Sequence, residues 1–307
     1  MSGRLPDFVI IGGMKCGTTT LHDQLALQPG FFMSTPKEPC FFSDDAVWNR
    51  GLAWYRSLFA DAPAGAICGE SSTHYTKLPT YPQTLPRLRR TLPNARLVYI
   101  VRDPVERIVS QYVHEWSRGE IRAPLADALR STPRLIEYSR YAMQLRPYAD
   151  AFGPDRILVI FFERMVAAPQ EQLDRVGRFL GAPRPLRWLE EAEMKNASHE
   201  RLRLGPAARA LLYRRPLTTL RRALVPKALR ERVKSRLRAT DRPSLTDADR
   251  RYIREQLDAD IELFGDMLGL PLRCDGFGDT AAATASPALV SSAAARTGRG
   301  TRAEAAA

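Results

Sequence analysis

The sequence of 307 residues has no uninterrupted apolar run of about 18 residues, the shortest length that forms a membrane-crossing helix. We therefore expect no membrane span. The first apolar run begins at Phe8, which leaves too little room for a signal peptide before it. These absences predict a cytoplasmic protein. Its formal net charge of +12 leaves peripheral contact with an anionic membrane open.

Cysteine is also scarce, and the spacing of the few that occur is uninformative for metal binding. Cys16, Cys40, Cys68 and Cys274 stand far apart without paired spacing, which argues against a zinc site and against a disulfide framework. Cys16 lies in a glycine-rich segment, where a helix N-terminus can lower the pKa of a thiol. Because no base lies near it in the sequence, we interpret Cys16 as a small filler and not as a nucleophile.

Buried strands and amphipathic helices alternate along the chain. Runs rich in Val, Ile, Phe and Tyr predict strands at 8–11, 96–101 and 157–162. Apolar spacing and end signals predict helices after Gly17, over 104–118 with Asp103 as N-cap and Glu106 completing a capping box, over 170–180, and over 246–268. This alternation predicts an α/β fold in three layers, with a mostly parallel sheet flanked by helices. Ligands of such sheets bind at the carboxyl ends of the strands.

The expected organisation is a single domain over residues 1–275, followed by a disordered Ala/Ser/Thr-rich tail over 276–307. Within the domain, residues 201–242 carry fourteen Lys and Arg against two acidic residues, so that this segment alone holds a charge of +12. Leucines recur there at three to five residues, which predicts broken amphipathic helices. The segment is either a solvated basic surface or a contact for a polyanion or an anionic membrane.

The first predicted strand continues into a turn and a helix start that almost spell a nucleotide-triphosphate loop, "FVIIGGMKCGTTTLHDQL". Gly12 and Gly17 have the right spacing, and Thr19 occupies the hydroxyl position. However, Thr18 stands where the lysine belongs, and the lysine, Lys15, lies inside the loop. Backbone N–H groups of such a loop bind phosphate whatever residue follows.

Two features of a triphosphate site are missing. No lysine adjoins Thr19, and the strand ending at Val101 is followed by Arg102, so no clear carboxylate is available for magnesium. The site therefore suits a shorter anion without a metal ion. A nucleotide kinase or other phosphotransferase of related fold remains the alternative.

At this point the sequence resembles a known family. The segment "GGMKCGTTTL" resembles the loop with which sulfotransferases bind the 5′-phosphosulfate of 3′-phosphoadenosine 5′-phosphosulfate (PAPS), and "VYIVRDPVERIVSQY" resembles their 3′-phosphate motif. The resemblance implies a fold related to nucleotide kinases, hence P-loop-like. The donor-binding residues that it implies are Lys15, Cys16, Gly17, Thr18, Thr19, Thr20, Arg102 and Ser110. For Arg102 the alternative is a surface ion pair with Glu106.

Further segments resemble the branch that acts on heparan-type polysaccharides and its bacterial relatives. They are "STPKEPCFFSDD", where Cys40 replaces a histidine, "GLAWYRSLF", and "GESSTHY", where Ser71 stands in a position that is lysine in some of these enzymes. The similarity covers about residues 7–200. A donor contact from Arg201 or Arg203 is also implied.

The resemblance and the chemistry assign three catalytic candidates. Lys15 suits neutralisation of the charge that grows on the leaving phosphate. Glu38 occupies the position of the catalytic base, unless it merely pairs with Lys37 or Lys15, and His74 is the rival base.

We expect a sulfotransferase that moves a sulfuryl group from PAPS to a hydroxyl, less readily an amine, of a carbohydrate, a glycolipid or a secondary metabolite. The expected reaction needs no metal, and no nucleic acid is an expected partner. Besides the kinase, the alternative is a non-enzymatic protein that binds polyanions or membranes through residues 201–242.

Overall fold

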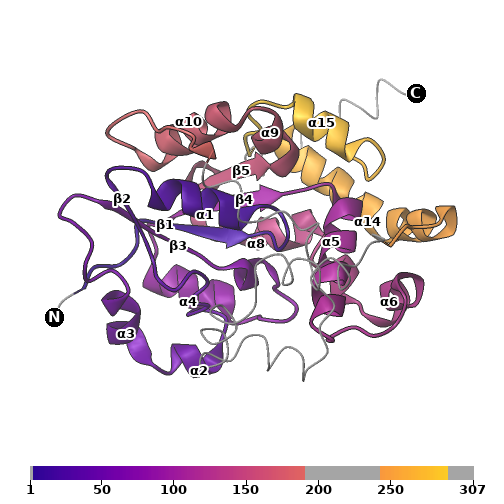
Figure 1. The fold of residues 1–307 in the computed structure, drawn as a ribbon, viewed down its shortest axis with the longest axis horizontal. Coiled ribbons are helices and arrows are strands. Elements are labelled where there is room, and N and C mark those ends of the chain that lie inside the picture. Colours follow the sequence, from indigo (N-terminus) through magenta and orange to yellow (C-terminus); the bar gives the residue numbers. More distant parts are fainter. Residues whose placement is uncertain (1–2, 191–242, 290–307) are drawn as a thin grey trace, which may run out of the picture.

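Five parallel strands form the sheet at the centre of the computed structural model, which describes residues 3–190 and 243–289 (Figure 1). Their order is β2-β3-β1-β4-β5, and each neighbouring pair is parallel. The strands are β1 Phe8–Gly12, β2 Phe31–Met33, β3 Ile67–Ser71, β4 Arg96–Val101 and β5 Ile157–Phe161. The predicted α/β class is confirmed.

Two of these strands were missing from the sequence prediction. β2 has only three residues, and β3 reads ICGES, which lacks a continuous apolar run. Gly69 of β3 is needed for packing, because a Cβ at this position would lie 2.1 Å from Cζ of Phe8 on β1. The polar end of β3 also has a structural role, since the Glu70 carboxylate accepts hydrogen bonds inside the core.

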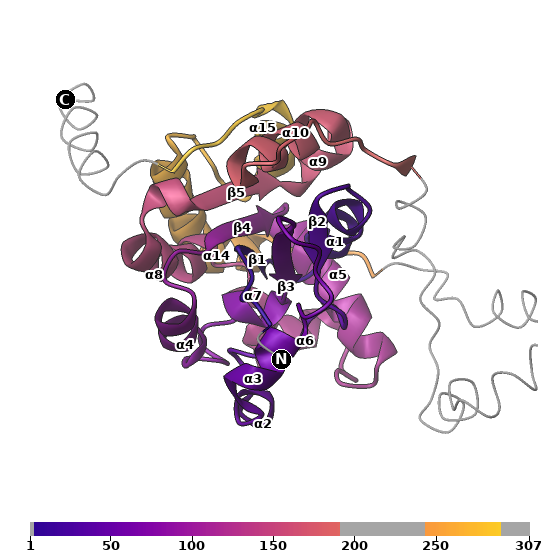
Figure 2. The ribbon, with the colours of Figure 1, turned by 90° about the vertical axis from the view of Figure 1, so that its left-hand side faces the viewer.

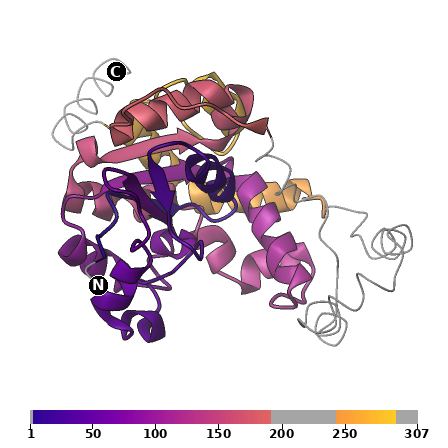
Figure 3. The ribbon, with the colours of Figure 1, turned by 60° about the vertical axis from the view of Figure 1, so that its left-hand side comes forward.

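Helices cover both faces of the sheet. One face, with Phe8, Ile10, Val98 and Ile160, packs against α1 and α10, and the other packs against α3, α4, α5, α8 and α14. Figures 2 and 3 show this layering from two further directions. The helices are α1 Thr18–Ala26, α2 Asp45–Trp48, α3 Gly51–Ser57, α4 Thr84–Thr91, α5 Pro104–Ser117, α6 Leu125–Ser131, α7 Arg134–Glu137, α8 Tyr141–Phe152, α9 Phe162–Ala167, α10 Pro169–Leu180, α14 Asp247–Leu268 and α15 Phe277–Ala283, with 3-10 turns η1 Thr73–Thr76 and η2 Pro154–Arg156.

The predicted start of α5 is half right. The Asp103 side chain accepts the N–H of Glu106 at 2.9 Å, as an N-cap does. The reciprocal bond of a capping box is made by another residue, because the Asp103 N–H donates to Oε1 of Glu163 at 2.8 Å. The Glu106 carboxylate instead pairs with Arg102.

The predicted disordered tail from residue 276 is wrong in its first part. α15 lies beside α9 (Figure 1), and Phe277 is fully buried with its ring centroid 5.8 Å from that of Phe161. One large aromatic residue thus anchors a segment whose alanine-rich composition predicted disorder. Residues 290–307 and the basic segment 201–242 lie outside the described residues. Among the described helices, none has the length and apolarity to span a bilayer.

Candidate functional site

The carboxyl ends of the five strands open onto one cavity of about 920 Å³. All strands run in the same direction, so the segments that follow them meet at one edge of the sheet. The cavity is lined by Lys15 after β1, Glu38 after β2, Lys77 after β3, Arg102 after β4 and Phe162 after β5. A cavity therefore lies where the sequence predicts the site.

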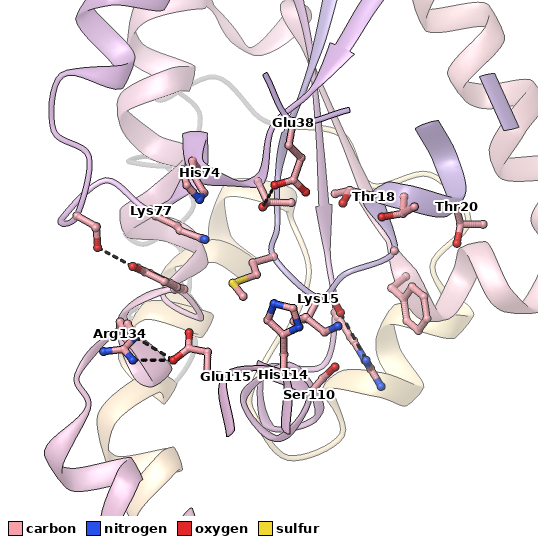
Figure 4. A pocket seen from close by; sticks show the side chains of 18 of the residues that line it. Lys15, Thr18, Thr20, Glu38, His74, Lys77, Ser110, His114, Glu115 and Arg134 are labelled. Carbon is pink, nitrogen blue, oxygen red and sulfur yellow. Dashed lines mark hydrogen bonds and ion pairs between the residues drawn. The ribbon is translucent and has the colours of Figure 1, made fainter. Parts of the chain in front are cut away.

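The lining divides into two walls, which adjoin at Ser110 and His114 of α5, and Glu38 lies between them on the other side (Figure 4). The loop wall is formed by Met14, Lys15, Gly17, Thr18, Thr19, Thr20, Arg102, Ser110, Phe162, Met165, Val166 and Trp188. The helical wall is formed by Thr73, His74, Lys77, Thr80, Tyr81, His114, Glu115, Arg118, Glu120, Arg134 and Tyr138.

The loop wall is built around the N-terminus of α1. Gly17 is its N-cap, with φ 87° and no side-chain cap, so the first N–H groups of the helix have no intrahelical partner and are available to an anion. A Cβ on Gly17 would lie 2.7 Å from Cδ2 of Phe162. Lys15 has φ 68°, a conformation that non-glycine residues seldom adopt and that often marks a functional site.

Cys16 does not line the cavity. Its side chain is fully buried in the core beneath α1, and its N–H donates to the Gly13 carbonyl at 3.2 Å. Burial raises the pKa of the Cys16 thiol to about 12, so the nearby helix N-terminus does not produce a thiolate. This geometry agrees with the interpretation of Cys16 as a small filler. It does not agree with the predicted contact between Cys16 and the donor.

Arg102 and Ser110, the two residues of the second motif, both line the loop wall. The Arg102 guanidinium donates to the Lys15 carbonyl at 3.5 Å, pairs with Glu106 at 3.4 Å and lies 4.9 Å from the centre of the Phe162 ring. Both interpretations of Arg102 are thus compatible with the structure. The Ser110 hydroxyl is buried without a hydrogen-bond partner among the described residues, although Ser110 lines the cavity. A ligand oxygen would satisfy it.

The Glu38 carboxylate is held in a defined orientation. Lys37 Nζ lies 3.0 Å from Oε1, and the Thr73 hydroxyl donates to Oε2 at 3.1 Å. Burial acts to raise the pKa of Glu38, but the charge of Lys37 and the hydrogen bonds from Lys37 and Thr73 outweigh it and hold the pKa below its usual value. The backbone of Glu38, with φ 57°, is in the left-handed region. The predicted pairing with Lys37 is present, and the carboxylate still lines the cavity.

His74 has the environment of a weak base. Its ring stacks on Tyr81 with centroids 4.5 Å apart. Burial, followed by the charge of Lys77, lowers the pKa of His74 to about 4. The imidazole is therefore neutral at pH 7.

A buried chain of polar side chains supports the helical wall and was missed by sequence reasoning. The fully buried Arg107 donates to Gln111 at 2.7 Å, Gln111 donates to Glu115 at 2.8 Å, and Arg134 lies 2.8 Å from the other oxygen of Glu115. Arg107 also donates to the Leu135 carbonyl at 2.6 Å, which ties α5 to α7. Arg107, Gln111 and Glu115 follow one another at i, i+4 spacing on α5. This spacing is the only signal in the sequence for the polar network.

A second buried acid, Glu70, supports the loop that carries Glu38. Glu70 is fully buried and accepts hydrogen bonds from Tyr55, Ser72 and Tyr75 at 2.7, 2.8 and 2.9 Å. The Ser72 hydroxyl in turn accepts the Cys40 N–H at 3.1 Å. Glu70 thereby fixes the loop that carries Glu38. Ser71, the departure from the family pattern, is buried and does not line the cavity.

The remaining predicted donor contacts, Arg201 and Arg203, lie outside the described residues. Of the other predicted site residues, Lys15, Gly17, Thr18, Thr19, Thr20, Glu38, His74, Arg102 and Ser110 all line the one cavity. Their roles stay predictions.

Comparison with known proteins shows a similarity to one family. Residues 48–185 match the sequence profile of the Sulfotransferase family. This part of the chain is therefore similar to the sulfotransferase family. The chain is 31% identical over 192 residues to heparan sulfate glucosamine 3-O-sulfotransferase 3B1 of Mus musculus, an alignment covering 60% of this chain and 48% of that protein. It is 32% identical over 190 residues to heparan sulfate glucosamine 3-O-sulfotransferase 6 of Homo sapiens, covering 59% and 54% respectively.

The fold agrees with this similarity. The crystal structure of a sulfotransferase from Alicyclobacillus acidocaldarius matches with a TM-score of 0.53 and 25% identity, covering 74% of this chain and 99% of that one. The predicted resemblance to sulfotransferases, a family of transferases, is thus confirmed. The chain spans about half the length of the curated relatives that it matches.

Proposed function

We propose that this chain transfers a sulfuryl group from PAPS to a hydroxyl group of a carbohydrate. The observation that carries the proposal is one cavity in which a phosphate-binding loop, an Arg–Ser pair and an oriented carboxylate face the same space. A kinase needs a lysine next to Thr19, and Thr18 occupies that position. The polar groups on the loop wall support the assignment as a sulfotransferase over that as a kinase.

The loop wall suits the donor. Its helix N-terminus and Lys15 would hold the 5′-phosphosulfate, and the orphan hydroxyl of Ser110, together with Arg102, would hold the 3′-phosphate. An apolar patch for the adenine adjoins them, made by Phe162, Met165, Val166 and Trp188. A predicted contribution from Arg201 or Arg203 remains part of the proposal.

The transfer requires one proton movement and one leaving group. The acceptor oxygen forms a bond to sulfur as the bond between sulfur and the bridging phosphate oxygen breaks. Glu38 takes the acceptor proton, because its lowered pKa keeps it ionised at neutral pH and its orientation is fixed by Lys37 and Thr73. The Lys15 ammonium compensates the negative charge that develops on the departing phosphate.

The helical wall suits a polar acceptor. Its aromatic and charged side chains, among them Tyr81, Tyr138 and Arg134, are of the kinds that stack on sugars and bond to their substituents. The choice of a carbohydrate rests on the names of the relatives, which act on heparan sulfate glucosamine. Contact of residues 201–242 with a polyanion or a membrane surface is a separate part of the proposal.

Thermal unfolding with adenosine 3′,5′-bisphosphate tests the donor assignment, beside ATP with magnesium and AMP, on wild type and Arg102→Ala. At a hundred times its dissociation constant a ligand adds about 2.7 kcal/mol to the free energy of unfolding. We expect stabilisation by the bisphosphate alone, and its loss in the variant. Stabilisation only by ATP with magnesium would contradict the proposal and support the kinase.

A further inference from the structure

One lysine on the helical wall has a position that the donor motifs do not explain. Lys77 is 8% exposed and lines the cavity. Its backbone is fixed on both sides, because its N–H donates to the His74 carbonyl at 3.1 Å and its own carbonyl accepts the N–H groups of Thr80 and Tyr81 at 2.9 Å each. The side chain therefore starts from a rigid turn after η1.

In the described part of the chain, the Lys77 ammonium differs from the other cations of the helical wall in having no carboxylate bonded to it. Arg118 pairs with Glu120 at 2.6 Å and Arg134 with Glu115 at 2.8 Å. Within residues 3–190 and 243–289, no hydrogen bond or ion pair engages Nζ of Lys77, which lies 5.3 Å from the centre of the Tyr138 ring. A nearly buried ammonium in this state has three donors for a ligand.

The surroundings of this ammonium point to the reacting centre. Burial lowers the pKa of Lys77, and the carboxylate of Glu38, the thiol of Cys40 and the carboxylate of Glu115 oppose that shift, Glu38 most strongly. In Figure 4 the Lys77 amino group extends from one side into the space below Glu38, and Lys15 approaches from below on the other side. An oxygen that gives its proton to Glu38 therefore lies between the two ammonium groups.

We propose that Lys77 binds the sulfuryl group itself during transfer, from the side opposite Lys15. This inference rests on the proposed function. An acceptor oxygen beside Glu38 must be within bonding reach of sulfur, so the non-bridging sulfuryl oxygens lie in the space that the Lys77 donors face. Lys15 neutralises the bridging oxygen, and Lys77 neutralises the oxygens that remain on sulfur. No bond other than those of the transfer forms or breaks.

The test compares two ligands that differ only in the sulfuryl group. Dissociation constants of PAPS and of adenosine 3′,5′-bisphosphate are measured by titration calorimetry for wild type, Lys77→Met and Lys77→Arg. Because a hydrogen bond to a charged group is lost, Lys77→Met is expected to weaken PAPS binding about tenfold or more and to leave bisphosphate binding unchanged. Lys77→Arg keeps the charge and should retain part of the preference.

The control is Arg118→Met, which removes a cation of the same wall that has its own carboxylate partner. It should change neither constant. Equal losses for both ligands in Lys77→Met, or no loss for either, would overturn the inference. If Lys77→Met does not fold, Lys77→Gln takes its place, with the same expected result. A wild-type protein that binds neither ligand would contradict the proposed function instead.

Discussion

The two walls of the cavity are built in different ways. Six residues of the loop wall are nearly contiguous, from Met14 to Thr20, and their positions depend on a glycine and on the start of one helix. The helical wall comes from three separate stretches, 73–81, 114–120 and 134–138. Its side chains are fixed by long-range contacts such as the bond from buried Arg107 to the Leu135 carbonyl.

This difference separates two kinds of recognition. Backbone N–H groups bind any phosphate, so the loop wall suits a donor that all members of a family share. Side chains that depend on distant partners can change without disturbing the loop. The helical wall is therefore where we expect acceptor preference to be decided.

The largest effect is expected at Glu38, which lies between the walls. Glu38→Gln removes the proton acceptor while keeping the shape, so turnover should fall by about 10²–10⁴-fold. Binding of adenosine 3′,5′-bisphosphate should not change, because we propose that this ligand binds at the loop wall. Transfer of radiolabelled sulfuryl to a heparan-type polysaccharide measures the first quantity, and calorimetry the second.

His74→Gln is the matched control for that experiment. It should retain most of the turnover, because Lys37 and Thr73 orient the Glu38 carboxylate toward the cavity, whereas the His74 ring stacks on Tyr81. If His74→Gln lost its turnover and Glu38→Gln retained it, His74 would be the base and the assignment of Glu38 would be wrong.

The next effect concerns the support beneath Glu38. Burial raises the pKa of Glu70 to about 7, despite the three hydrogen bonds that it accepts, from a usual value of 4.5. The folded protein thus keeps this proton over a range in which the unfolded chain has lost it. Glu70 thereby contributes about 3 kcal/mol to the free energy of unfolding. This contribution is fully present below about pH 4.5 and is lost as the pH rises through about 7.

Between pH 5 and pH 8 the free energy of unfolding of the wild type should fall because of Glu70. Glu70→Gln should remove this fall of about 3 kcal/mol. The amide still accepts hydrogen bonds from Tyr55 and Tyr75, so the fold should persist. Urea unfolding at both pH values measures the difference. An unchanged pH dependence in the variant would show that Glu70 is ionised equally in the folded and unfolded states.

The smallest effect is expected at Cys16. Its thiol packs into the core below the loop wall, so Cys16→Ala should lower the free energy of unfolding by about 1–2 kcal/mol through the cavity it leaves. The affinity for adenosine 3′,5′-bisphosphate should stay the same. Weaker ligand binding with unchanged stability would instead place the thiol in the donor site.

The polar residues of the loop wall were predictable from the sequence, whereas of the helical wall only His74 was. Gly17, Lys15 and Arg102 follow apolar runs at motif spacing, so local pattern was enough to place them. Lys77 and Arg134 have no such signal, because their positions depend on η1 and on the buried partners of α5. β3 escaped prediction because it lacks an apolar run, and its buried Glu70 is stabilised by Tyr55 and Tyr75, which lie outside the strand.

The most direct test of the account compares one arginine from each wall. Adenosine 3′,5′-bisphosphate is titrated calorimetrically into wild type, Arg102→Ala and Arg134→Ala. The account predicts that Arg102→Ala weakens binding by about ten- to a hundredfold, as expected for a lost charged contact to phosphate, and that Arg134→Ala leaves it unchanged. Equal loss in both variants, or loss only in Arg134→Ala, would contradict the assignment of the donor to the loop wall.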